Sequence, residues 1–205
     1  MNYRIVSDSS SNVFALEGAN YTTVPMKVIA GDMEFIDTPE LDLSGMVSYL
    51  QGYKGKSGSS CPNVQEWLDA FAGEDDIFAI TISKNLSGSY NSAMVAKQNY
   101  EEQYPDRRVF VIDSLSAGPE LKLIIEKLQE YIVEGKDFDE ICALIMEYKE
   151  HTGLIFSLAS VRNLANNGRV SHLVASAVGI LGIRILGRAS AQGTLEQLYK
   201  SRGEK

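Results

Sequence analysis

The chain has 205 residues, enough for one large domain or two small ones, and its 44% hydrophobic and 22% charged residues are ordinary for a globular protein. Its formal net charge of -8 argues against nucleic acid as a partner, because a phosphate-binding surface needs basic character. The longest apolar run is too short to cross a membrane. Two widely separated cysteines, Cys61 and Cys142, with no secretory leader ahead of them, are typical of a reduced, cytoplasmic protein.

The first third of the chain predicts short strands followed by two helices. Because Pro25 interrupts the second strand, we expect an edge or irregular strand there. Asp42 is placed to cap the first helix, and Pro62 to begin the second. Residues 52–60, rich in Gly, Ser and Lys, are expected to form a loop. The strands are predicted over residues 3–6, 21–29 and 34–36, and the helices over residues 44–51 and 63–72.

The middle of the chain predicts a strand, a helix and a strand, and then two more helices. The spacing of the two strands suits a βαβ unit, so we expect them to be parallel. Gly135 separates the last two helices, and Asp137 is placed to cap the second of them. The strands cover residues 77–82 and 109–112, and the helices cover about 90–100, 121–132 and 138–148. This alternation predicts an N-terminal α/β domain, residues 1–151, with a mainly parallel sheet flanked by helices.

The pattern changes after His151. Two strands joined by Ala191-Gln192-Gly193 have the signature of a β-hairpin. So few elements give a thin basis for an independent core, and we interpret residues 152–205 as a partial second α/β domain. Its strands are predicted over residues 154–158, 183–188 and 194–200, and its helices over residues 161–165 and 172–181.

Polar side chains follow three predicted strands of the first domain. Asp8 ends the first strand, a turn with Ser83, Ser87 and Ser89 follows the strand 77–82, and Asp113 ends the next. In a parallel sheet these carboxyl ends meet at one rim, where ligands bind. The turn also precedes a helix, whose free N–H groups and dipole favour negative charge. The alternative interpretation is that the two aspartates merely cap the turns that follow them.

Hydroxyls suit a single carboxylate or a neutral polar head better than a polyphosphate, which usually draws Lys, Arg or a metal. Ser57, Ser59 and Ser60 could add a second row of hydroxyls, or form a polar loop in which Ser60 caps a helix. With two histidines and two scattered cysteines, we expect no metal site. The tail is locally basic, and the turn Asn167-Gly168-Arg169 presents a further arginine. These arginines either form a solvated surface or face an acidic partner.

A series of short motifs runs in order along the whole chain. They are Ile5-Val6-Ser7-Asp8-Ser9-Ser10, Val24-Pro25-Met26-Lys27-Val28, Ser59-Ser60-Cys61-Pro62, Ile82-Ser83 with Leu86-Ser87-Gly88-Ser89-Tyr90, Ile112-Asp113-Ser114, and Asn163-Leu164 through Gly168-Arg169-Val170. Together these motifs resemble the DegV family of bacterial fatty-acid-binding proteins. The tail, from Ile183 to Lys205, looks like a clostridial-type variant of that family's second domain.

The resemblance implies a non-catalytic protein that holds a long-chain fatty acid in a cleft between two domains, with no other cofactor. It implies that such proteins present the acid to an ATP-dependent kinase, which makes an acyl phosphate for phospholipid synthesis. Arg169 and Arg202 occupy positions that would face this kinase. The resemblance carries over Ser59, Ser60, Ser87 and Ser89 as the residues that bind the carboxylate. Ser83, in the same turn as Ser87, is added to this set.

The chain also departs from the family pattern. Ser59 and Cys61 replace the usual Thr and Gln, and Ile185-Leu186 stands where many members have a proline. Family members continue beyond this point, so we expect the second domain to lack its C-terminal part. Two alternatives remain open: an enzyme acting on a small carbonyl or sugar substrate with Asp8 or Asp113 as base, and an inactive fragment with an exposed half-cleft.

Overall fold

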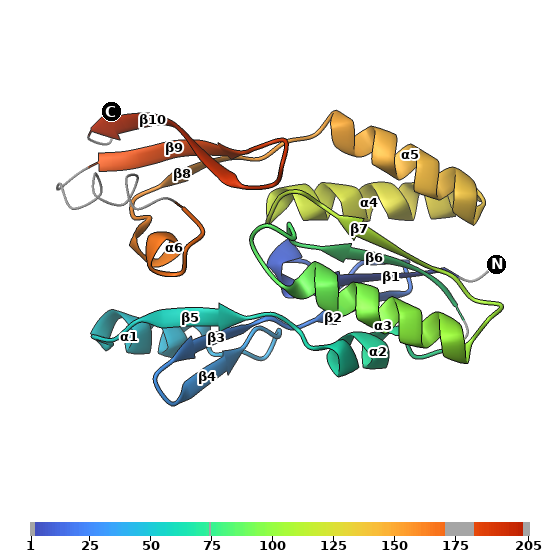
Figure 1. Ribbon diagram of the computed structural model, residues 1–205, viewed down its shortest axis with the longest axis horizontal. Helices are drawn as coiled ribbons and strands as arrows, with labels where there is room; N and C mark the ends of the chain where they lie inside the picture. The colour runs from blue at the N-terminus through green and yellow to red at the C-terminus, as the bar shows by residue number, and fades with distance from the viewer. Residues whose placement is uncertain (1–2, 74, 171–182, 203–205) are drawn as a thin grey trace.

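The computed structural model describes residues 3–73, 75–170 and 183–202. Three sheets make up this part of the chain (Figure 1). The helix predicted over residues 172–181 lies outside the described residues. Among the described residues, no helix has both the length and the apolar character needed to span a bilayer.

The central sheet has four parallel strands in the order β2-β1-β6-β7. Its helices lie on both faces, α2 and α3 on one and α4 and α5 on the other (Figure 1). The predicted βαβ unit and the parallel, helix-flanked sheet are therefore confirmed. The elements are β1 (Tyr3–Asp8), β2 (Tyr21–Val24), β6 (Asp76–Thr81), β7 (Val109–Asp113), α2 (Val64–Phe71), α3 (Ser89–Gln103), α4 (Pro119–Val133) and α5 (Phe138–Glu150).

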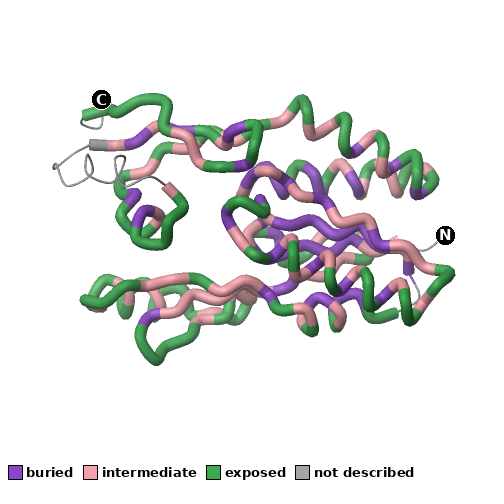
Figure 2. Tube along the Cα trace, viewed as in Figure 1, coloured by how far each residue is buried: buried purple, intermediate pink, exposed green. Residues whose placement is uncertain are grey.

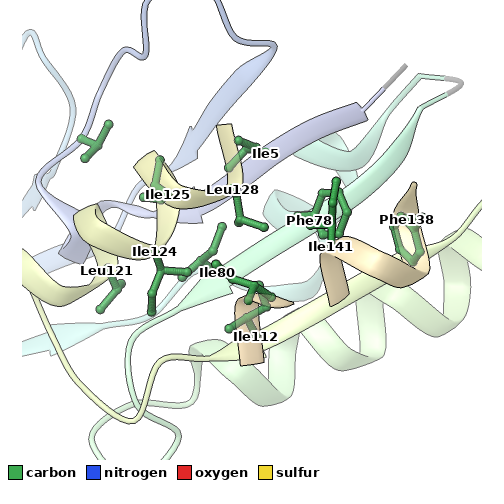
Figure 3. Close-up of a cluster of buried hydrophobic side chains, with 12 residues drawn as sticks. Ile5, Phe78, Ile80, Ile112, Leu121, Ile124, Ile125, Leu128, Phe138 and Ile141 are labelled. Carbon is green, nitrogen blue, oxygen red and sulfur yellow. The ribbon is translucent and has the colours of Figure 1, made fainter. Parts of the chain in front are cut away.

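The core consists of two layers, one on each face of this sheet. Along β6, Phe78 and Ile80 face α4 and α5, whereas Ile77 and Ala79 face α2 and α3. All four are fully buried, as expected for a central strand covered on both faces. Figure 3 shows the first layer, in which Phe78 stacks on Phe138 with their ring centroids 4.7 Å apart.

Several local predictions are confirmed because they depend only on short-range chemistry. Asp42 caps α1 (Leu43–Gly52), and its carboxylate accepts a hydrogen bond of 2.9 Å from the Gly45 N–H. Asp137 caps α5 in the same way. Pro62, by contrast, precedes the helix that it was expected to begin, because Asn63 forms a capping box with Glu66 and starts α2.

A second sheet, antiparallel in the order β4-β3-β5, extends beyond the carboxyl end of the parallel strands. Pro25 divides the strand predicted over residues 21–29 into two. β2 is an edge strand as predicted, whereas β3 (Lys27–Ala30) is the middle strand of the second sheet and pairs with β4 (Met33–Ile36). The loop predicted over residues 52–60 is wrong in its last part. There β5 (Ser57–Ser60) pairs with β3 through main-chain hydrogen bonds, which need no apolar side chains.

The third sheet is antiparallel, in the order β10-β9-β8, and has α6 (Arg162–Asn166) beside it. It confirms the predicted hairpin, formed by β9 (Ile183–Ala189) and β10 (Leu195–Arg202), with β8 (Ile155–Leu158) against β9. Figure 2 shows that buried residues gather around the central sheet, while these outer elements are largely exposed or half-buried. The division into domains 1–151 and 152–205 stays a prediction.

Candidate functional site

Asp8 joins three elements at the rim where the parallel strands end. It is fully buried, and its Oδ2 accepts hydrogen bonds of 2.9 Å from the Ile82 N–H and 2.6 Å from the Ser89 hydroxyl. The Ser10 hydroxyl donates to the other oxygen. Burial raises the pKa of Asp8, and the hydrogen bonds from Ser10 and Ser89 oppose that rise. Asp8 therefore anchors the start of α3 to the end of β1.

The serine turn, residues 83–89, is held from a second side by the tip of the β9–β10 hairpin. The Ser83 hydroxyl is buried and donates a 2.7 Å hydrogen bond to the Gly193 carbonyl. The Asn85 side-chain amide donates one of 2.6 Å to the Gln192 carbonyl. The hydroxyls of Ser83 and Ser89 thus have protein partners already, and neither residue lines the pocket described next.

A pocket of about 380 Å³ lies between the serine turn, β5 and α6. Ser57 and Ser59 of β5 and Ser87 of the turn are its hydroxyl-bearing lining residues, and Arg169 is the one charged residue among the described residues that line it. Most of the remaining wall is apolar. The apolar lining residues are Met26, Val28, Leu50, Ile82, Leu86, Ala117, Leu164 and Leu195. This combination suits a ligand with an apolar body and an anionic head.

The other predicted site residues fall in different places. Ser60 does not line the pocket, and its hydroxyl donates a 3.3 Å hydrogen bond to the Cys61 carbonyl. Arg169, predicted to face a partner, lines the pocket and donates a 2.7 Å hydrogen bond from its Nε to the Leu86 carbonyl of the serine turn, and its contact with a partner stays a prediction. Arg202 is exposed at the end of β10, away from the lining residues.

Asp113 behaves as a turn cap. Its Oδ1 accepts hydrogen bonds from the backbone N–H groups of Leu115, at 3.0 Å, and Lys84, at 3.3 Å. Neither Asp113 nor Asp8 lines the pocket, and the hydrogen bonds of both go to the backbone or to other side chains of the protein. Among the described residues no group of His, Cys, Asp or Glu could hold a metal ion.

Three of the lining residues that the sequence did not single out as ligand contacts come from α6 and the turn after it. Asn163, Leu164 and Asn167 line the pocket although they lie more than 70 residues from Ser87 in the chain. Asn167-Gly168-Arg169 had a recognisable turn signature, but a turn signature does not show what the turn packs against.

The profile described as "Uncharacterised protein, DegV family" matches residues 2–205. The chain belongs to the DegV family. A DegV domain-containing protein of Streptococcus gordonii is 44% identical over 209 residues, which cover 100% of this chain and 74% of that protein. The family resemblance carried by the short motifs is therefore confirmed.

Solved DegV structures share the fold closely. A DegV family protein from Eubacterium eligens, loaded with heptadecanoic acid, superimposes with a TM-score of 0.95 at 45% identity, over 98% of this chain and 73% of that one. The Fatty Acid Kinase (Fak) B3 protein of Streptococcus pneumoniae, loaded with linoleic acid, gives 0.96 at 42% identity, over 99% and 74%. This DegV chain thus spans about three quarters of the length of these relatives.

Proposed function

We propose that this DegV chain binds a long-chain fatty acid, with the carboxylate at Ser59 and Ser87 beside Arg169 and the acyl chain along the apolar wall. The observation that carries the proposal is the lining of the pocket, which is apolar except for hydroxyls, amides and one cation. The solved relatives loaded with heptadecanoic and linoleic acid support it.

Affinity in this proposal comes mainly from the tail, because each buried CH₂ contributes roughly 0.8 kcal/mol. The head is selected by donors: two hydroxyls donate hydrogen bonds, and the permanently charged guanidinium of Arg169 offsets the negative charge. Ser83 and Ser89 act indirectly, by fixing the turn that carries Ser87. Ser60 neighbours Ser59 on β5, and its predicted contact with the ligand stays a prediction.

We further propose that the bound acid is presented to an ATP-dependent fatty-acid kinase, which carries out the chemistry. The likeness to the Fak B3 protein of Streptococcus pneumoniae supports this partner. The protein itself then needs no catalytic group, in keeping with two aspartates that do not line the pocket. Arg202, exposed on β10, and Arg169, at the pocket, are the residues that we expect the kinase to contact.

Denaturing extraction followed by mass spectrometry tests the proposal directly, and we expect the purified protein to release fatty acid. After delipidation, titration with oleate should show saturable binding that Ser87→Ala weakens about ten- to hundred-fold, the effect of losing one hydrogen bond to a charged group. Ser92→Ala, in the first turn of α3 and outside the pocket lining, is the matched control. Protein that is free of lipid and takes up no oleate contradicts the proposal.

A further inference from the structure

The wall that carries Ser59 has little to hold it in place. β5 consists of Ser-Gly-Ser-Ser and pairs with a single strand, β3. None of its residues is buried, and it contributes no apolar side chain to a core. A strand of this kind is fixed in position only by its main-chain partners. The position of the Ser59 hydroxyl therefore depends on whatever else contacts β5.

Asn167 supplies such a contact from the opposite wall of the pocket. Its Nδ2 donates a hydrogen bond of 3.0 Å to the Ser57 carbonyl and one of 2.8 Å to the Asn163 carbonyl of α6. The second bond fixes the amide relative to its own helix, so the first holds β5 at a set distance from α6.

The contact continues to the serine turn. Arg169 donates from Nη1 to the Asn167 carbonyl, at 2.6 Å, and from Nε to the Leu86 carbonyl, at 2.7 Å. Gly168, with a φ of +72°, provides the left-handed turn between them. A chain of hydrogen bonds thus runs from the Ser57 carbonyl through Asn167 and Arg169 to the Leu86 carbonyl. It ends one residue before Ser87.

We infer that Asn167 is a positioning residue, which sets the gap between Ser59 and Ser87 and so controls recognition of an acyl carboxylate. The inference rests on the proposed function. Two hydroxyls can share one carboxylate only when each lies about 2.6–3.0 Å from an oxygen, so a small outward shift of β5 removes one bond. The acyl tail, which meets a broad apolar wall, tolerates such a shift better.

The experiment compares two ligands with one tail, oleate and oleyl alcohol, on the delipidated protein. Asn167→Ala is expected to weaken oleate binding about ten-fold and oleyl alcohol binding less than two-fold. Asn167→Gln keeps an amide donor, and we expect it to restore oleate affinity to within about three-fold of the wild type. Asn166→Ala, at the exposed neighbouring position and outside the pocket lining, should leave both affinities unchanged.

Each other result is informative. Equal losses of affinity for the two ligands would show that Asn167 only supports the fold of the pocket. Unchanged affinities would show that β5 does not need the hydrogen bond from Asn167. Either result overturns the inference. A wild type that binds neither ligand overturns the proposed function, and the inference with it. A loss confined to oleate that Asn167→Gln fails to restore would assign the effect to something other than the amide donor and would also overturn it.

Discussion

A single residue, Asp8, determines which serine hydroxyls of the turn are left to contact a ligand, because it accepts a hydrogen bond from Ser89. A buried carboxylate is costly unless it accepts several hydrogen bonds, and Asp8 accepts them from the ends of two other segments. Its partner Ser89 lies 81 residues away in the chain. The sequence showed three hydroxyls in one turn, but it did not show which of them would donate a hydrogen bond to Asp8. That choice depends on the pairing of β1 with β6, a long-range feature.

The raised pKa of Asp8 makes a prediction about stability and pH. Because the folded pKa lies above the ordinary value of 3.8, the protonated form favours folding; this contribution is complete below 3.8 and is lost as the pH rises through the folded pKa. Asp8→Asn removes the titration. The unfolding free energy of the variant, relative to that of the wild type, should therefore increase as the pH rises from below 3.8 through the folded pKa, by about 1.4 kcal/mol for each pH unit that separates the folded from the unfolded pKa.

Urea denaturation at a series of pH values measures this difference. Asp42→Asn is a control of opposite sign, because the hydrogen bond from the Gly45 N–H lowers the pKa of Asp42. The stability that ionised Asp42 contributes is present above pH 3.8 and is lost as the pH falls through the folded pKa. The unfolding free energy of Asp42→Asn, relative to that of the wild type, should therefore decrease as the pH rises. Parallel curves for Asp8→Asn and the wild type would contradict the prediction.

The tip of the β9–β10 hairpin is the element that fixes the serine turn from outside. Gly193 has a φ of +75°, and a Cβ there would lie 2.3 Å from the Ser83 Oγ and 2.8 Å from the Leu115 Cα. Only glycine fits at such a distance from a neighbouring main chain. The hairpin signature in the sequence predicted the two strands, but the docking of its tip follows from the tertiary structure.

Gly193→Ala is therefore expected to destabilise the protein by about 2–4 kcal/mol, through backbone strain and the clash with Leu115. Equilibrium unfolding in urea measures the loss, and limited proteolysis should show faster cleavage in the hairpin. Gly52→Ala is the matched control, since nothing lies within 4 Å of its Cβ position at the end of α1, and it should be neutral or slightly stabilising. An equal effect of the two substitutions would rule out a docked tip.

Elements with a strong periodic pattern were predictable, and those made by pairing alone were not. α4 and α5 bury Leu121, Ile124 and Ile141 at helical spacing, so their sequence already indicates one apolar face. β5 has no such pattern, and its Ser and Gly residues are typical of a loop. The site was missed in part for the same reason: Ser59 and Ser87 were predicted, while Asn163 and Asn167 reach the pocket only through the packing of α6.

At the scale of the whole molecule, the pocket is made by all three sheets and their connections. β3 and β5 form one wall, the serine turn after β6 forms the second, and α6 with β10 completes it. These parts lie in separate layers and are joined mainly by the hydrogen bonds of Asn167, Arg169, Ser83 and Asn85 (Figure 1). A ligand that contacts every wall should therefore stabilise the layers against separation.

Hydrogen exchange with and without oleate checks this expectation. At a free oleate concentration of about 100 times its Kd, local openings that break the pocket should cost about 2.7 kcal/mol more than in the free protein. Local protection should increase most in β5, the serine turn and α6, because these segments line the pocket and have few buried residues. α5, which packs on the far face of the central sheet, serves as the internal control. Protection that rises equally in α5 would mean that oleate stabilises the fold as a whole and does not join its layers.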